Sequence, residues 1–305
     1  MEKFASKKVF IFLGILAILN ILAWSVVFDF SKQKFLEVNF FDVGQGDSIF
    51  IETPQLQQVL IDGGPSSKIL EKLGKEMPFW DRSIDLIILS HPEADHLSGL
   101  IDVLKKYKVD NILWTGIIRY TPEYKEWQKL IKEEGAKIFI ASKGRKIKMA
   151  NDISIDILFP FESAEGKEFE NSNDTSIVNR LVIGYNSFLF TGDITKLAEK
   201  EIIREYSCSN PPPTNPLVGG ECEFAVLDSD VLKIAHHGSK TSSSEDFLKE
   251  VSPEIAVISV GKDNSYGHPT QGVLENLNKY GIKVLRTDEL GDIKIISDGK
   301  TIKIE

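Results

Sequence analysis

The chain has 305 residues, of which 42% are hydrophobic and 27% are charged, and its net charge is −9. This length allows one large domain or two small ones, and the composition excludes a chain that is disordered throughout. The acidic balance argues against broad electrostatic binding of nucleic acid, although it leaves room for a local basic groove.

The N-terminal segment has the composition of a membrane-spanning helix. Val9 to Phe28 form a run of 20 residues without a charge, and about 20 apolar residues in a helix span a hydrocarbon core of roughly 30 Å. Three lysines precede the run, and by the positive-inside rule they keep the N-terminus in the cytoplasm: Lys3, Lys7 and Lys8. We therefore predict a cytoplasmic tip and anchor over residues 1–30, a single pass through the membrane by residues 9–28, and an extracytoplasmic location for the rest.

A cleaved signal peptide is the alternative for this segment. Ala23, Trp24 and Ser25 have the small-x-small pattern of a cleavage site. The uncleaved anchor is favoured because the apolar run continues past this site to Phe28. Both alternatives export the remainder of the chain.

Strands and helices alternate along the rest of the chain, after a short polar linker from Ser31 to Lys34. Apolar runs and alternation predict strands within residues 35–44, 48–53, 58–64, 84–90, 111–116, 137–142, 153–160, 177–184, 187–193, 231–238 and 254–261, and a hairpin over 292–305. Helical spacing predicts helices within residues 97–108, 122–135, 195–206, 244–251 and 270–281. Such an alternation in both halves favours two packed sheets with helices outside, in one domain over residues 35–305.

The two cysteines of the chain, Cys208 and Cys222, lie in a segment rich in Pro and Gly. An even number of cysteines in an exported protein is typical of a disulfide. We therefore predict that Cys208 and Cys222 form a disulfide that closes a surface insertion over about residues 207–223. Two free thiols are the alternative, and a metal site is disfavoured because no histidine lies near them.

The stretch "LSHPEADHLSG" places four candidate metal ligands within six positions, where a predicted strand meets a predicted helix: His91, Glu93, Asp95 and His96. Side chains on a tight turn can converge on one point, whereas side chains along a strand alternate between its faces. Imidazole nitrogens and carboxylate oxygens together suit divalent first-row metals. The alternative is a polar helix terminus in which Asp95 acts only as a cap.

Further candidate ligands follow other predicted strands. Asp193 follows the strand in "FLFTGD", and His236 and His237 follow the strand in "VLKIAHHG". His268 stands in "SYGHP", and "SNDTSIV" supplies oxygen ligands from Asn173 and Asp174. All five histidines of the chain therefore lie in short polar motifs at predicted strand ends, which favours one shared metal site.

The order of these motifs resembles the metallo-β-lactamase superfamily. The motifs are "DVGQGDS", "LIDGG", "LSHPEADHLSG", "NDTSIV", "FTGD", "HHGSKTSS" and "ISVGKDNSYGHP", and the resemblance covers Phe35 to Glu305. More narrowly, the chain is similar to a stand-alone form of the extracytoplasmic hydrolase domain of ComEC-type DNA-uptake proteins. The resemblance implies an αββα sandwich, preceded here by one N-terminal transmembrane helix, with a two-metal site at the ends of the sheets.

The resemblance also implies a role for each candidate ligand. His91 and Glu93 would bind the first metal, Asp95 and His96 the second, and Asp193 would bridge both. The second metal would take one of His236 and His237, and the first would take Asp174 or Asn173 where a histidine is usual. Because Glu93 and Asp174 replace histidines of the commoner pattern, the first site is rich in oxygen ligands, so Mn²⁺ suits the pair of divalent ions as well as Zn²⁺.

Several other residues are candidates for contact with the substrate. Asp42 and Asp47 lie in a turn expected near the metals, and Ser239 and Lys240 could bind a phosphate or merely cap the next helix. Asp62 in "LIDGG" is interpreted as structural support. For catalysis we expect Asp95 to orient the attacking hydroxide held by the metals and Asp193 to bridge the ions. We expect His268 or His237 to neutralise the phosphoryl oxygens or to protonate the leaving group.

Together these features predict a membrane-anchored extracytoplasmic phosphodiesterase that depends on two divalent ions and acts on DNA. A single membrane span cannot form a pore, so the hydrolase activity is separate from transport. Three alternatives remain at this point: a phosphodiesterase of a cell-surface polymer, a lactam or lactone hydrolase, and a non-catalytic binding module stabilised by metal. The sequence leaves the oligomeric state open.

Overall fold

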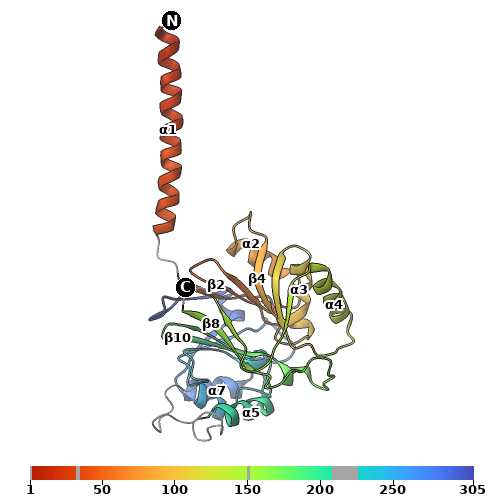
Figure 1. Cartoon of the computed structure of the whole chain (residues 1–305). Coiled ribbons are helices and arrows are strands. Elements are labelled where there is room, and N and C mark those ends of the chain that lie inside the picture. The colour runs from red at the N-terminus through yellow and green to blue at the C-terminus, as the bar shows by residue number, and fades with distance from the viewer. Residues whose placement is uncertain (1, 32–34, 150–151, 208–225) are drawn as a thin grey trace. The chain divides into compact units, whose positions relative to one another are not determined.

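The computed structural model describes residues 2–31, 35–149, 152–207 and 226–305. The predicted disulfide between Cys208 and Cys222 lies outside these residues. The chain divides into two units, Met1–Lys34 and Phe35–Glu305 (Figure 1).

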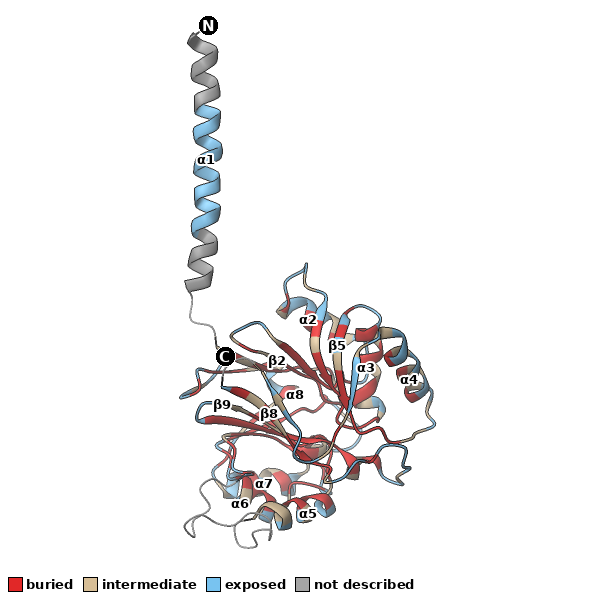
Figure 2. Cartoon of the chain, viewed as in Figure 1, coloured by how far each residue is buried: buried red, intermediate tan, exposed pale blue. Residues whose placement is uncertain are grey.

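The first unit contains one long helix, α1 (Glu2–Ser31). Between Phe10 and Trp24 its large hydrophobic side chains are exposed (Figure 2). Among the helices that the structure describes, none combines the length and the hydropathy needed to cross a membrane. The membrane span predicted for residues 9–28 therefore has no support from the structure.

The second unit contains two β-sheets. The first has the strand order β15-β14-β1-β2-β3-β4-β5-β6 and the second the order β13-β12-β11-β10-β9-β8-β7. The strands of the first sheet are β1 (Leu36–Phe40), β2 (Ile49–Glu52), β3 (Gln58–Ile61), β4 (Ser83–Ile88), β5 (Lys108–Trp114), β6 (Lys137–Ile140), β14 (Ile293–Ser297) and β15 (Ile302–Ile304). Those of the second are β7 (Lys146–Lys148), β8 (Ile153–Phe159), β9 (Val178–Ile183), β10 (Asn186–Phe190), β11 (Val231–Lys233), β12 (Ile255–Ile258) and β13 (Lys283–Arg286).

Helices cover the outer face of each sheet. On the first sheet these are α2 (Lys68–Glu76), α3 (Ala94–Leu104) and α4 (Pro122–Glu134), which share a hydrophobic core with β4 and β5. On the second they are α5 (Lys196–Tyr206), α6 (Glu245–Val251) and α7 (Gln271–Lys279), packed on β8 to β12. A short helix, α8 (Thr287–Leu290), follows β13. A third core lies between the two sheets and is built from their inward-facing side chains, such as Phe40, Phe188 and Phe190. These layers form the αββα sandwich that the sequence predicts (Figure 1).

The parallel parts of the two sheets determine where polar loops can meet. Strands β3, β4, β5 and β6 run parallel in the first sheet, and β10, β11, β12 and β13 run parallel in the second. The carboxyl ends of parallel strands share one edge of a sheet, so the loops after β4, β10, β11 and β12 can face one another. These loops contain the histidines and aspartates of the predicted site.

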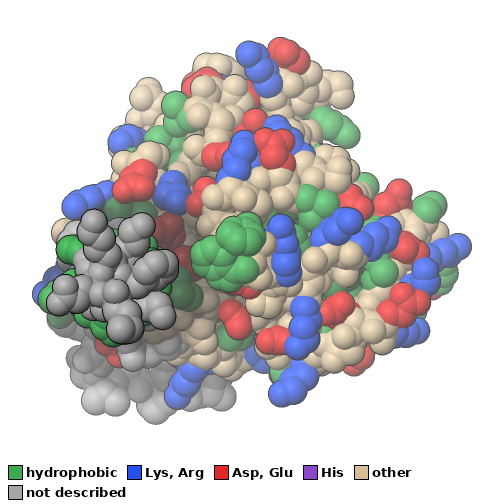
Figure 3. Space-filling view, turned by 90° about the horizontal axis from the view of Figure 1, so that it is seen from above, with side chains coloured by type: hydrophobic (Ala, Val, Ile, Leu, Met, Phe, Trp, Pro, Cys, Tyr) green, Lys and Arg blue, Asp and Glu red, His purple; other side chains and the backbone are tan. Residues whose placement is uncertain are grey.

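The surface seen in Figure 3 mixes charges of both signs. Lys and Arg side chains are interspersed with Asp and Glu over this face, and no continuous basic groove is visible on it (Figure 3). This face therefore offers no broad basic surface to an anion.

Candidate metal centre

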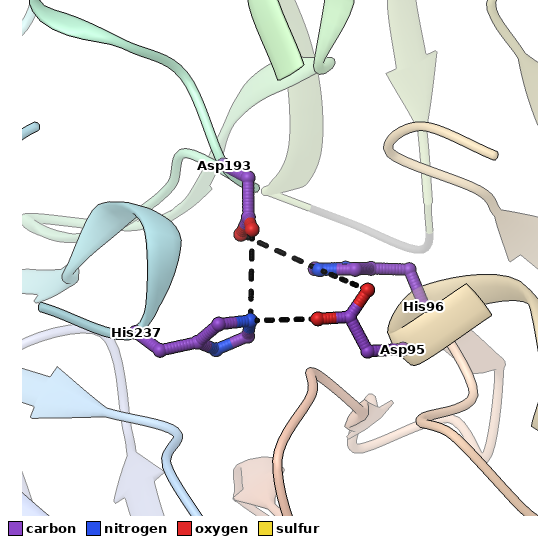
Figure 4. A group of neighbouring side chains, drawn as sticks. All are labelled: Asp95, His96, Asp193 and His237. Atoms are coloured by element: carbon purple, nitrogen blue, oxygen red, sulfur yellow. Dashed lines mark hydrogen bonds and ion pairs between the residues drawn. The ribbon is translucent and has the colours of Figure 1, made fainter. Parts of the chain in front are cut away.

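Four residues bring their ligand atoms within 4.8 Å of one another: Asp95, His96, Asp193 and His237. Figure 4 shows their side chains pointing toward a common centre. Asp193 Oδ1 lies 3.4 Å from His96 Nε2, and Asp193 Oδ2 lies 3.5 Å from His237 Nε2. Asp95 lies 3.3 Å from His237 Nε2 through Oδ2 and 3.9 Å from His96 Nε2 through Oδ1.

The local structure explains how these side chains converge. Asp95 and His96 stand in the first turn of α3, seven and eight residues after β4 ends at Ile88. Asp193 follows the end of β10, and His237 follows β11. His237 has a φ of 56°, in the left-handed region that residues other than glycine rarely adopt. Backbone strain of this kind is concentrated at functional sites, where the surrounding structure has to impose it.

Hydrogen bonds behind the cluster aim the imidazole rings at the centre. His96 Nδ1 lies 2.8 Å from Asp62 Oδ2, and His237 Nδ1 lies 2.8 Å from the carbonyl oxygen of Ser259. Both partners are acceptors, so each Nδ1 carries a hydrogen, and each Nε2 can offer a lone pair to a metal ion once its own proton is displaced. Asp62 is itself held by Ser90, whose backbone N–H and hydroxyl donate to its two carboxylate oxygens over 2.7 and 2.6 Å. Asp62 is therefore the structural support that the sequence suggests.

The unsatisfied atoms of the cluster fit a divalent metal ion. His91 Nε2, His96 Nε2 and Asp193 Oδ1 are buried and have no hydrogen-bond partner among the described residues. Buried polar atoms without a partner are costly, and a metal ion would satisfy these. Ligand atoms about 2.0–2.1 Å from a tetrahedral Zn²⁺ lie roughly 3.3–3.4 Å apart, close to three of the four distances given above.

The charges of the cluster also match a divalent ion. Burial opposes a charge on His96, but Asp193, Asp62 and Asp95 outweigh burial and raise its pKa well above the usual value. Burial likewise opposes a charge on His237, and Asp193 with Asp47 raises its pKa to about 10. Without metal, both imidazoles therefore hold a proton beside two carboxylates. One divalent cation can replace these two protons without a change in net charge.

A buried ion pair lies next to the cluster, on the side of Asp193. The Lys233 ammonium contacts the Asp47 carboxylate, lies 3.7 Å from Asp193 Oδ1 and donates to the carbonyl oxygen of Gly192 over 3.1 Å. Burial disfavours the charged form of Lys233, but Asp47 and Asp193 outweigh it and raise the pKa of the ammonium. Because Asp47 is 1% exposed and paired with Lys233, the structure differs from the predicted contact between Asp47 and substrate.

The cluster opens into a cavity of about 340 Å³. His236 and His268 line this cavity, with their ring centroids 5.8 Å apart. Of the predicted pair His236 and His237, the structure thus places His237 in the cluster and His236 at the cavity. His236 Nε2 still lies 3.8 Å from Asp193 Oδ2.

The ligands expected for a first metal are not assembled in the same way. Glu93 Oε1 accepts a hydrogen bond from Arg119 Nη2 over 2.6 Å and also contacts the Ser172 hydroxyl. Asp174 contacts the hydroxyl of Thr195. Asn173 lines the cavity, whereas Asp174 is not among the described residues that line it. Of the histidine and carboxylate ligands expected at this position, His91 Nε2 and the shared Asp193 remain available among the described residues, and Asn173 could add only a neutral amide oxygen.

The remaining predicted substrate residues lie elsewhere. Asp42 forms a 3.0 Å ion pair with Lys68, and Ser239 Oγ lies 2.9 Å from the Thr241 hydroxyl. Neither these two nor Lys240 is among the described residues that line the cavity. Asp42 is therefore engaged in an ion pair at the surface, and Ser239 bonds within its own turn.

The sequence interpretation missed several residues of the site, and three of them bear on its chemistry. Arg119 and Tyr266 line the cavity, and Lys233 lies beneath the cluster. Lys233 precedes the paired histidines in "VLKIAHHG", and Tyr266 stands in "SYGHP", so both are within motifs already singled out. Arg119 follows β5, which lies beside β4 in the first sheet. In the sequence, its position shortly after a predicted strand is the one signal that could have indicated it.

Known proteins match this chain in sequence, and the family match lies within the second unit. Residues 41–262 match the metallo-beta-lactamase superfamily. ComE operon protein 3 of Bacillus subtilis is 32% identical over 275 residues, which cover 85% of this chain and 32% of that protein. Competence protein ComA of Neisseria gonorrhoeae is 31% identical over 258 residues, which cover 84% of this chain and 32% of that protein. The chain thus spans about a third of the length of these curated relatives.

A solved structure agrees with the fold. Igni18, a metallo hydrolase from the archaeon Ignicoccus hospitalis, superposes with a TM-score of 0.52 at 15% identity and covers 86% of this chain and 98% of its own. At that identity the likeness concerns the fold alone. The αββα sandwich, the cluster of histidines and aspartates suited to a divalent metal, and the match over residues 41–262 agree with one another. The chain belongs to the metallo-beta-lactamase superfamily, as a metal-dependent hydrolase related to ComEC-type competence proteins.

Proposed function

We propose that this chain is a metal-dependent phosphodiesterase that cleaves DNA. One observation carries the proposal: the metal cluster shares its cavity with an exposed aromatic side chain. Tyr266 is 70% exposed, and its ring is stacked on that of His268 with centroids 5.8 Å apart and an angle of 23° between the planes. An exposed ring beside a metal centre can stack on a nucleobase while the neighbouring phosphate reaches the metal.

The same feature favours DNA over a base-free phosphodiester polymer of the cell surface. Stacking on an aromatic ring contributes about 1–3 kcal/mol per base in complexes with single-stranded nucleic acid, and a polymer without bases gains none of it. The names of the two relatives, an operon protein of competence type and a competence protein, support the same substrate class.

The metal ion would be held by Asp95, His96, Asp193 and His237, and when bound it would supply Lewis-acid activation of water and of the phosphoryl oxygen. Asp95 lines the cavity with its side chain 34% exposed. Burial opposes ionisation of Asp95, but His96 and His237 outweigh it and hold its pKa below the usual value. The ionised carboxylate can therefore accept a hydrogen bond from the attacking water and orient it.

His268 is placed to bind the phosphoryl group. Burial and the neighbouring His236 lower the pKa of His268 below its usual value, so the ring is neutral at pH 7. A neutral imidazole has one N–H donor and is a poor acid toward a leaving group. We therefore assign His268 to a hydrogen bond with a phosphoryl oxygen, in preference to protonation of the leaving group.

The identity and number of the ions also belong to the proposal. Two imidazole nitrogens and two carboxylates suit Zn²⁺ and Mn²⁺ alike. The two-ion centre expected from the sequence would require Glu93 to leave Arg119, because the described ligands for the first position are otherwise too few.

The compartment is a further part of the proposal and rests on the N-terminal sequence alone. The uncharged run from Val9 to Phe28, preceded by lysines, favours an anchored protein whose hydrolase domain lies outside the cytoplasm. DNA arriving at the cell surface would be the substrate in that compartment.

The proposal is tested with the full-length chain purified in detergent. The protein is treated with a chelator and then reloaded with Mn²⁺ or Zn²⁺, and its turnover is measured on single-stranded DNA, duplex DNA and bis(p-nitrophenyl) phosphate. We expect chelation to abolish turnover and metal to restore it. Turnover that persists unchanged after complete metal removal, or a metal-loaded protein inactive on all three substrates, would contradict the proposal.

A further inference from the structure

The described residues that line the cavity over the metal cluster include one side chain with a permanent positive charge. Among the described residues that line the cavity, Arg119 alone is a Lys or Arg, whereas Glu93, Asp95, Glu170 and Asp193 carry carboxylates. A phosphodiester is anionic, and these acids would repel it in the absence of compensating positive charge. Arg119 is therefore placed to offset this repulsion when an anionic substrate enters the cavity.

Arg119 is held in place by its neighbours. Its Nη2 donates to Glu93 Oε1 over 2.6 Å, and its Nη1 lies 3.3 Å from the carbonyl oxygen of Phe169. The hydroxyl of Ser172 contacts the same oxygen of Glu93, so the carboxylate is fixed from two sides. A guanidinium has five N–H donors in a planar fork, and these contacts leave donors for an oxyanion in the cavity.

This arrangement occupies the ligand that a first metal would need. Glu93 stands at the position where the family's first metal takes a ligand, yet its carboxylate is turned to Arg119. Asp174, the other oxygen ligand expected there, is turned to Thr195. His91 and the shared Asp193 supply two ligand atoms, and Asn173 at the cavity offers only a neutral amide oxygen. The three protein ligands typical of a catalytic metal are histidine, cysteine or carboxylate side chains, so this position is one short.

We propose that the centre holds one divalent ion and that Arg119 supplies the second positive charge, binding a non-bridging oxygen of the phosphate. This inference rests on the proposed phosphodiesterase function and names the group that receives the substrate's phosphate. Glu93 is then a positioning residue for Arg119 and not a metal ligand. Arginine suits this role because its guanidinium keeps its charge at every accessible pH and matches the geometry of phosphate oxygens.

Metal content provides the first test. Full-length protein is stripped, reloaded with excess Mn²⁺ or Zn²⁺, freed of unbound metal and analysed by elemental mass spectrometry. We expect one ion per chain in the wild type and one in Arg119→Gln. Two ions per wild-type chain, with loss of one in Glu93→Gln, would overturn the proposal because Glu93 would then be a ligand.

Binding of inorganic phosphate to the Mn²⁺-loaded protein provides the second test, measured by calorimetry. We expect Arg119→Gln to weaken binding at least tenfold and Arg119→Lys to retain part of it, because lysine keeps the charge but loses the planar fork. Arg204→Gln, at an exposed position in the last turn of α5, is the matched control and should bind as the wild type does. Unchanged phosphate affinity in Arg119→Gln would overturn the proposal.

Kinetics on bis(p-nitrophenyl) phosphate separate this inference from the proposed function. If the wild type hydrolyses this substrate, Arg119→Gln should lower kcat/KM at least tenfold at unchanged metal content, and an unchanged kcat/KM would count against Arg119. If no form of the protein hydrolyses this substrate or either form of DNA, the proposed function fails, whereas the ion count and the phosphate affinities still decide whether Arg119 binds an oxyanion beside a single ion.

Discussion

The two halves of the candidate metal centre both take residues from the segment between β4 and α3, and they differ in how their ligands are supported. In the half formed by Asp95, His96, Asp193 and His237, each imidazole is aimed by an acceptor behind it, Asp62 for His96 and the Ser259 carbonyl for His237. In the other half, the carboxylates of Glu93 and Asp174 are taken by Arg119 and Thr195. The difference teaches that the groups behind a ligand decide whether it can bind a metal, because the motif spacing is shared by both halves.

The supported half should be the more sensitive to mutation, and Asp193 should show the largest effect. Asp193→Ala removes a carboxylate that contacts both His96 and His237, so their remaining charges would repel each other. We expect loss of bound metal and a fall in turnover of at least about 100–1,000-fold, the range seen for loss of one key electrostatic group. Elemental analysis and the rate on bis(p-nitrophenyl) phosphate are the measurements.

Asp246→Asn is the control for this comparison, because Asp246 lies on α6 with its side chain 84% exposed. It should keep the metal content and the rate of the wild type. Full metal and full activity in Asp193→Ala would show that the centre lies elsewhere.

The support behind the ligands gives the next largest effect. Asp62→Asn keeps the size of the side chain but removes the charge that accepts from His96 Nδ1. Loss of such an outer partner typically lowers metal affinity about 10–100-fold. Competition with a coloured chelator measures the affinity, and circular dichroism verifies folding. An affinity equal to that of the wild type would mean that Asp62 does not hold His96 in its binding orientation.

The rim of the cavity should affect only substrates that carry bases. Tyr266→Ala should weaken binding of single-stranded DNA by about 1–3 kcal/mol, the range for loss of one stacked base, and should leave the metal content unchanged. The chosen comparison is KM for a short single-stranded oligonucleotide against KM for a phosphodiester that lacks nucleobases.

Tyr266→Phe is the matched variant, because it retains the ring and should behave as the wild type. Equal losses on both substrates in Tyr266→Ala would argue against a stacking role.

The sequence predicts most of the fold because long apolar runs and helical spacing are local signals. The segments at 84–90 and 122–135 correspond to β4 and α4, and the αββα order follows from the alternation. The elements that were missed are α2, β7, β13 and α8. Most of these are short, and α2 has few apolar residues in "KILEKLGKE", so a local pattern carries little signal for them.

The candidate site likewise has a part that local sequence signals predict and a part that they do not. The motifs place His91, Asp95 and His96 near one another because they share a turn, and strand ends bring Asp193 to the same edge. The direction of Glu93 could not be predicted, because it is set by Arg119, 26 positions further along the chain. The same holds for the choice between His236 and His237, which the Ser259 carbonyl decides by accepting a hydrogen bond from His237.

The unsupported half can be tested by restoring a ligand, and this change should have the smallest effect on turnover. Glu93→His removes the partner of Arg119 and places an imidazole beside His91 and Asp193, so three protein ligands become available for a second ion. We expect the metal content to rise from one to two ions per chain, with a shift from Mn²⁺ toward Zn²⁺ because imidazole nitrogen suits zinc better. Turnover should change less than in Asp193→Ala, since the four supported ligands are untouched.

Glu93→Gln, which cannot supply an imidazole, should remain at one ion, and elemental analysis of both variants in the two metals measures the difference. If Glu93→His still binds one ion, the contacts of Glu93 with Arg119 and Ser172 are not the reason why a second ion fails to bind. The geometry of the loop would then be the reason.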